Sequence, residues 1–182
     1  MILEGPSFDF IKSIRSWLRK AAGLYERIGD AEKKDACIDI ANGAQSPLEI
    51  LDAFIELGQG LGDLRINVYT PNGGNNYTKM IYSDCQREEF GRRTNIHVSK
   101  IFAEGRIFDS FLPKLNELSM PVLLIKGRHD PIICEEQTDS FVNDVRNGHL
   151  KVYEESGHLL HFEEPERFAM DVIQFVLETN QN

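Results

Sequence analysis

Two residues able to do acid–base chemistry stand just after two apolar segments in the last third of the chain. Asp130 follows the run VLLIK (122–126) and a Gly-Arg-His turn, and His158 follows LKVYEE (150–155) and a Ser-Gly turn. Adjacent parallel strands place the loops at their carboxyl ends side by side. An aspartate that accepts the Nδ1–H of a histidine fixes its tautomer and stabilises the imidazolium. The order of acid then histidine therefore predicts an acid–base pair.

Each half of this pattern is weak by itself. A Gly-x-x-Asp segment is a common exit from a strand, and Ser-Gly-His is short. The neighbouring histidines receive other interpretations, because His129 is expected to point away and His161 to be structural. Glu163, Glu164 and Pro165 are interpreted as the opening of the last helix, where acidic groups and proline are favoured.

The elements around this pair alternate between strand and helix. We expect strands at 122–126 and 150–153 and helices at 135–145 and 165–177, together with a short strand over 1–5 that stops at Gly5-Pro6. This alternation is typical of a parallel sheet with right-handed crossovers. The run Val122–Ile125 is apolar at every position, as in a strand covered on both faces. The predicted fold class is α/β.

Residues 8–105 are expected to be mainly helical. Apolar residues spaced three or four apart predict a helix from Ser7 or Asp9 through Ala21, with a weaker continuation to Ile28. Further helices are predicted at 31–41, from the Ser46-Pro47 start signal onward, and from 83 to 90, resuming at 96–102. Residues 64–69 are interpreted as a short extended piece and 71–77 as a turn or exposed loop.

Composition excludes several classes of protein. The chain has 182 residues, 41% hydrophobic and 27% charged, with a net charge of −9 and a pI near 5.0. Such an acidic chain repels a phosphate backbone, so nucleic-acid binding is not expected. No apolar run is long enough to span a bilayer, so no membrane association is expected. The first residues lack the pattern of a signal peptide, and we expect a cytoplasmic protein.

Cysteine and histidine usage predicts neither disulfides nor a metal site. The cysteines are Cys37, Cys85 and Cys134, an odd number at wide spacing without a CxxC motif. This usage favours reduced thiols in a cytoplasm. No cysteine lies near the His158/His161 pair, and no cofactor is expected.

The segments GRHDPI (127–132) and SGHLLHFEEPERF (156–168) resemble the C-terminal part of the α/β-hydrolase superfamily, most of all its proline iminopeptidase branch. Related esterases and C–C bond hydrolases share much of the pattern, and the resemblance is specific over about residues 113–178. It implies a triad acid at Asp130 and a general base at His158. It also implies the end of a sheet strand at 1–7, a helical cap at 8–112 and the C-terminal part of the hydrolase core at 113–182. For an aminopeptidase it suggests that Glu104, with Glu88 and Glu89 behind it, binds the ammonium group of the substrate, although each is also a plausible solvated surface acid.

One part of the family pattern is missing. The family nucleophile is a serine in Gly-x-Ser-x-Gly, and the 182 residues of this sequence contain no such pentapeptide. Ser7 is a superficial candidate, but Pro6 precedes it and Asp9 stands where the second glycine belongs. The oxyanion-hole segment is absent as well. We therefore expect a truncated frame, a fragment or one half of a split hydrolase, inactive alone, that acts on a small peptide or ester once an N-terminal segment completes it.

The alternatives are a non-catalytic binding or regulatory protein derived from the fold, or an esterase or C–C bond hydrolase. Because a partial sheet leaves an apolar parallel edge unpaired, we also expect a homo-oligomer or association with an N-terminal fragment.

Overall fold

The computed structural model describes residues 1–71 and 83–179, and its centre is a small parallel sheet. The strands are β1 (Ile2–Glu4), β2 (Val122–Gly127) and β3 (Gly148–Tyr153), in the order β1-β2-β3. In register, Leu3 lies beside Leu124, and Lys126 lies beside Val152. Both strands predicted around the acid–base pair are confirmed, each a little longer than expected.

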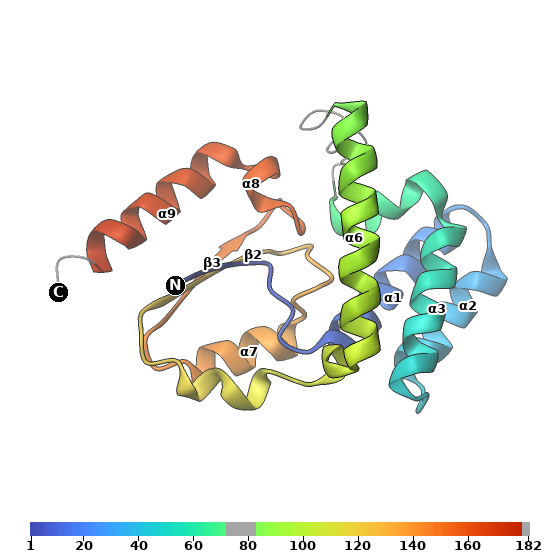
Figure 1. Cartoon of the computed structure of the whole chain (residues 1–182), viewed down its shortest axis with the longest axis horizontal. Coiled ribbons are helices and arrows are strands. Elements are labelled where there is room, and N and C mark those ends of the chain that lie inside the picture. Colours follow the sequence, from blue (N-terminus) through green and yellow to red (C-terminus); the bar gives the residue numbers. More distant parts are fainter. Residues whose placement is uncertain (72–82, 180–182) are drawn as a thin grey trace.

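Helices cover both faces of the sheet, so β2 is buried along its whole length (Figure 1). Val122 and Leu124 face helix α7 (Glu135–Asp144) and the 3₁₀ segment η3 (Leu112–Glu117). Leu123 and Ile125 face α9 (Pro165–Thr179), which follows the short helix α8 (Leu160–Glu163). This alternation explains why the sequence of β2 is apolar at consecutive positions, and it confirms the α/β prediction.

The region between β1 and η3 is helical. It contains α1 (Phe10–Arg27), α2 (Ala31–Asn42) and α3 (Pro47–Gly60), which pack around a shared apolar core that includes Trp17, Leu18, Tyr25, Cys37 and Ile50. The Asp9 side chain accepts the N–H of Lys12 and so caps α1. Ser46 and Glu49 form the capping box that the sequence predicts for α3.

Two local predictions in this region are corrected. Residues 64–69 are not extended, because the 3₁₀ segment η1 (Gly62–Arg65) runs directly into helix α4 (Ile66–Tyr69). The two expected helical pieces after Ser83 are one helix, α6 (Asp84–Glu104), which ends at Gly105 with φ of 68°. The loop predicted at 71–77 lies, from residue 72 onward, outside the described residues.

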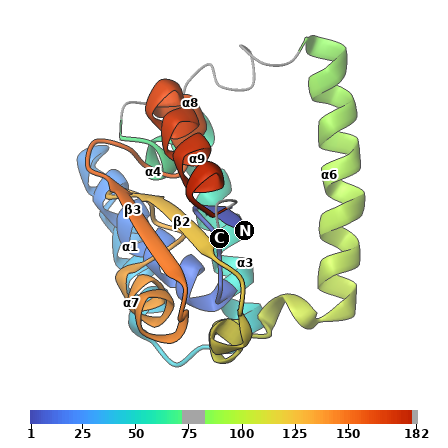
Figure 2. The ribbon, with the colours of Figure 1, turned by 90° about the vertical axis from the view of Figure 1, so that its left-hand side faces the viewer.

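Helix α6 stands along one side of the molecule, and its contacts concentrate on the 3₁₀ segment η2 (Arg106–Phe108) (Figure 2). Within the described part of the chain, no helix is long and apolar enough to cross a membrane.

A buried glutamine joins the helical region to the sheet. The Gln137 side chain on α7 is fully buried, and its Oε1 accepts the N–H groups of Phe8 and Asp9 at 2.8 and 2.9 Å. Its Nε2 donates to the carbonyl of Ile132 at 2.9 Å and to Ser13 Oγ at 3.1 Å. The amide thus holds the start of α1 against the loop that follows β2, which is the loop that carries Asp130.

Candidate functional site

The loops that leave β2 and β3 are tied together by main-chain hydrogen bonds. The Arg128 N–H donates to the Tyr153 carbonyl at 2.8 Å, and the His129 N–H donates to the Ser156 carbonyl at 3.0 Å. A side chain at Gly127 would overlap the carbonyls of Ser156 and Gly157, so only glycine lets the loops approach this closely. The sequence therefore brings the two strand exits together through a backbone contact.

Asp130 and His158 meet at this junction. His158 Nδ1 lies 3.0 Å from Asp130 Oδ2 and 3.2 Å from Oδ1. Oδ1 also accepts the N–H of Ile132 at 2.7 Å, which fixes the carboxylate in a local turn. The aspartate side chain is fully buried, whereas the imidazole is 28% exposed. The carboxylate of the pair is therefore buried, whereas its imidazole is partly exposed to solvent.

The charge environment favours protonated His158. Burial lowers the pKa of the imidazole, but its hydrogen bond to Asp130 and the negative charges of Asp130, Glu4 and Glu163 outweigh this effect. The net result is a pKa above the ordinary histidine value. This is the electrostatic setting that an imidazole needs to accept a proton in a reaction.

Two residues from the helical region also reach the site, and neither was predicted from sequence. The carbonyl of Tyr69 at the end of α4 accepts the His158 N–H at 2.8 Å, and the two rings lie 5.8 Å apart. Lys20 Nζ on α1 donates to the carbonyl of His129 at 2.5 Å. Burial lowers the pKa of Lys20, and the nearby charges of Asp130 and Glu163 partly offset this. Neither residue stands in a local motif, because each contact depends on how the helices pack on the sheet.

Known proteins are similar to parts of this chain in sequence and in fold. Residues 91–165, which include both Asp130 and His158, match the family model of the S33 serine aminopeptidases. The crystal structure of proline iminopeptidase from Mycobacterium smegmatis aligns with 99% of this chain at a TM-score of 0.52 and 15% identity, over 57% of its own length. The chain therefore has the fold of part of an α/β-hydrolase, and residues 91–165 are similar to the S33 serine aminopeptidases.

Two curated relatives are 2-hydroxy-6-oxononadienedioate/2-hydroxy-6-oxononatrienedioate hydrolases. The protein from Paraburkholderia xenovorans is 28% identical over 79 residues, 43% of this chain and 27% of the relative. The protein from Klebsiella pneumoniae is 27% identical over 101 residues, 54% of this chain and 35% of the relative. The chain thus spans about a third of the length of these curated relatives or less.

The acidic residues suggested for substrate binding have varied surroundings. Glu104 is exposed at the end of α6 and lines a cavity of about 330 Å³ with Phe8, Phe10 and Phe111 among its walls. These lining residues are a different set from those that contact His158. Glu89 binds Arg92 and Arg93, and their guanidinium groups lower its pKa to about 2. Glu88 is exposed. An ammonium-binding role for Glu104 stays a prediction, and Glu89 is already engaged by cations.

The remaining histidine and acidic residues of the motif have structural partners. His161 Nδ1 lies 2.7 Å from Glu4 Oε1, so His161 links α8 to β1, and His129 is exposed. Glu164 accepts from Ser156 Oγ at 2.5 Å and from Arg167 at 3.0 Å. The last helix begins at Pro165, so Glu163 does not open it: Glu163 ends α8, and its carboxylate turns back toward the His158 loop. No group of three metal-binding side chains occurs within the described ranges.

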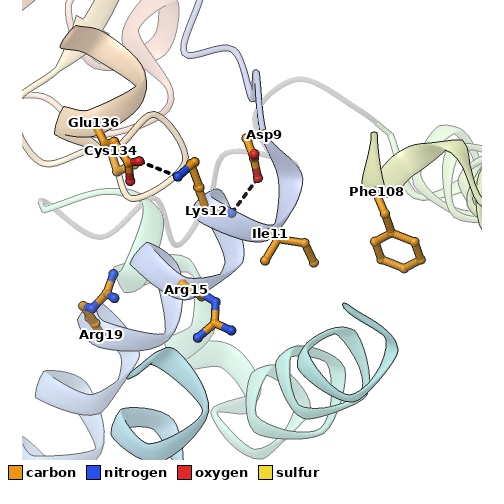
Figure 3. A pocket seen from close by; sticks show the side chains of 8 residues that line it. All are labelled: Asp9, Ile11, Lys12, Arg15, Arg19, Phe108, Cys134 and Glu136. Carbon is orange, nitrogen blue, oxygen red and sulfur yellow. Dashed lines mark hydrogen bonds and ion pairs between the residues drawn. The ribbon is translucent and has the colours of Figure 1, made fainter. Parts of the chain in front are cut away.

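A second cavity, of about 350 Å³, lies beside α1 and is lined by basic side chains (Figure 3). Lys12 pairs with Glu136, while Arg15 donates to the carbonyls of Ile40 and Ala41. Arg19 donates to the Ala41 carbonyl and to Asn42 Oδ1. The two arginines therefore stabilise the carbonyl end of α2, and these cations have protein partners of their own.

Proposed function

We propose that Asp130 and His158 are the acid and the general base of a hydrolase triad. The observation that supports this is the contact of 3.0 Å between His158 Nδ1 and the fully buried Asp130 carboxylate, where two adjacent parallel strands end. Sites in open parallel sheets lie at this edge. The family match over residues 91–165 covers both side chains.

The proposed chemistry follows from the hydrogen bond. With its Nδ1–H donated to Asp130, the imidazole keeps Nε2 as the acceptor. Nε2 takes the proton of a serine hydroxyl as that oxygen attacks the substrate, and it later gives the proton to the leaving group. The buried carboxylate stabilises the imidazolium between these steps, in agreement with the raised pKa of His158.

For the substrate, we propose a peptide with an N-terminal proline, cleaved as in a proline iminopeptidase. The motif SGHLLHFEEPERF and the family match support this choice. A second candidate is hydrolysis of a C–C bond, which the two curated relatives favour. A carbonyl carbon is attacked in both reactions, so the same Asp130–His158 pair serves either one.

We propose that the nucleophile comes from a segment outside these 182 residues, since they contain no Gly-x-Ser-x-Gly. We propose that such a segment docks against the outer edge of β1 and the exposed apolar side of α9, formed by Met170, Ile173 and Leu177. The chain alone is then expected to be inactive, because covalent catalysis is lost without the serine.

Two steps test this proposal. The DNA upstream of Met1 should encode a Gly-x-Ser-x-Gly segment, in frame or frameshifted. The chain, alone and coexpressed with that segment, is then assayed with proline p-nitroanilide, p-nitrophenyl acetate and a dienedioate substrate. We expect hydrolysis only in the coexpressed sample and its loss in His158→Ala. Unrelated upstream sequence, together with saturable ligand binding but no turnover, would instead favour the non-catalytic alternative. Preference for the dienedioate would identify a C–C bond hydrolase.

A further inference from the structure

The Glu163 side chain contacts the main chain on both sides of His158. Its carboxylate accepts the Gly157 N–H at 3.0 Å on both oxygens, and its Oε1 accepts the Leu159 N–H at 3.1 Å. The carboxylate is the acceptor for both residues that flank the histidine. It sits at the end of α8, on the same short helix that follows the loop.

The carbonyl of Tyr69 completes the arrangement. It accepts the N–H of His158 itself at 2.8 Å, so three consecutive N–H groups each have a fixed acceptor. Glu163 approaches the loop from α8, whereas Tyr69 approaches from α4 in the helical region. A side chain at Gly157 would overlap the Tyr69 carbonyl, which shows how closely this acceptor approaches. The backbone of the histidine is therefore held from two different elements.

We propose that Glu163 is a positioning residue for His158, which it holds in the orientation that donates Nδ1–H to Asp130. This inference rests on the proposed role of His158 as a base. A hydrogen bond of 3.0 Å between two side chains requires the backbone of each residue to be fixed. Asp130 is fixed by its own turn and by burial. The loop that carries His158 is fixed by the hydrogen bonds that its main chain donates to the Glu163 carboxylate.

Three substitutions separate the contributions of hydrogen bonding and charge. Glu163→Gln keeps an oxygen acceptor and removes the charge, whereas Glu163→Ala removes both. Glu166, exposed in the first turn of α9, provides a matched control for the loss of one negative charge, as Glu166→Gln.

The test uses NMR of the 182-residue chain, because its readouts need no turnover. The downfield Nδ1–H resonance of His158, assigned by its absence in His158→Ala, reports the bond to Asp130. The amide exchange rates of Gly157 and Leu159 report their hydrogen bonds to the Glu163 carboxylate, and the backbone amide spectrum reports the overall fold.

We expect Glu163→Ala to lose the Nδ1–H resonance, to lower the pKa of His158 and to speed exchange of the Gly157 and Leu159 amides by about tenfold or more. Glu163→Gln should keep the resonance, with a smaller fall in pKa, and Glu166→Gln should match wild type. If Glu163→Ala fails to fold, Glu163→Gln still decides, because a retained resonance and slow amide exchange, together with a fall in the pKa of His158 that Glu166→Gln does not show, support the positioning role. Two results would overturn the positioning role of Glu163. One is a folded Glu163→Ala with wild-type exchange rates and an unchanged resonance, and the other is fast exchange of both amides in Glu163→Gln.

Failure of this inference is distinguishable from failure of the proposed function. If the resonance behaves as expected but the completed protein hydrolyses none of the substrates, Glu163 still positions His158 and the triad proposal is wrong. If hydrolysis occurs and Glu163→Ala changes neither the resonance nor the exchange rates, the triad proposal survives without this role for Glu163.

Discussion

Gly5 packs against the imidazole of His158. A Cβ added to Gly5 would stand 2.9 Å from His158 Nδ1, and it would stand 2.8 Å from Asp130 Oδ2. The φ of Gly5 is +46°, a region that residues with side chains rarely adopt. The end of β1 therefore passes beside the Asp130–His158 hydrogen bond and leaves no room for a methyl group.

Gly5→Ala should weaken this hydrogen bond and the fold together. The methyl group has to push the two side chains apart, and the positive φ adds strain of about 1–3 kcal/mol. We expect a lower free energy of unfolding in urea and loss of the His158 Nδ1–H resonance. The control is Gly23→Ala in α1, where a Cβ has nothing within 4 Å, and where alanine should stabilise the helix by about 0.5–1 kcal/mol. Equal stability of the two variants would contradict this account.

Protonation of His158 should make the fold more stable at neutral pH than at alkaline pH. Its folded-state pKa is raised above 6.5, so the folded protein binds this proton more tightly than the unfolded chain does. The extra stability is complete below pH 6.5 and is lost as pH rises through the folded-state pKa. Urea unfolding between pH 6 and 9 measures this loss of stability, and the free energy of unfolding should fall less with pH in His158→Gln. If it falls equally in both proteins, His158 is not the cause.

The acid–base pair could be predicted from sequence because its signals are local. An apolar run marks a strand that is buried on both faces, and parallel neighbours place their exit loops together. Asp130 and His158 each follow such a run directly. Their proximity therefore follows from strand order, which the connections between strands restrict.

Other parts of the site depend on contacts that the local pattern does not encode. Residues 64–69 are predicted to be a short extended piece, yet they form 3₁₀ and α-helical turns that pack against α1 and α3. Tyr69 contributes a main-chain carbonyl, which leaves no trace in residue type. Glu163 matched an ordinary helix opening, and only the fold shows its carboxylate turned back to Gly157.

Lys126 is a lysine buried in the central strand of the sheet. It is 6% exposed in β2, and its Nζ donates to Thr138 Oγ1 at 3.1 Å. Burial lowers its pKa, which the charges of Asp130 and Glu135 only partly offset. We expect Lys126→Met, of similar length and without charge, to unfold within about 1 kcal/mol of wild type or to be more stable.

The pH dependence of unfolding checks the Lys126 prediction further. Because the folded-state pKa of Lys126 is lowered from 10.5, the unfolded chain binds the proton more tightly, and the contribution of Lys126 to stability should rise as the pH increases from the folded-state pKa to 10.5. Lys126→Met should lack this contribution. Lys126→Ala, which leaves a cavity, should lose about 2 kcal/mol or more. A Met variant as unstable as the Ala variant would show that the ammonium itself stabilises the fold.

The exposed apolar side of α9 should drive self-association when the chain is purified alone. Phe175 on this helix is buried against the sheet, whereas Met170, Ile173 and Leu177 are 64%, 58% and 58% exposed. Their spacing of three and four residues places them on one side of the helix. If this side normally receives the nucleophile-bearing segment, a second copy should occupy it in the absence of that segment. Light scattering at micromolar concentration should then give a mass above that of the 20.8 kDa monomer.

Ile173→Lys should shift this equilibrium toward the monomer, because it places a charge in the middle of the apolar side. Val142 on α7 is 55% exposed and lies outside this surface, so Val142→Lys adds the same charge elsewhere and should leave the mass unchanged. Coexpression of the nucleophile-bearing segment should replace the self-association with a one-to-one complex that Ile173→Lys weakens. A wild-type chain that is monomeric at these concentrations, or two lysine variants that behave alike, would show that α9 is not the docking surface.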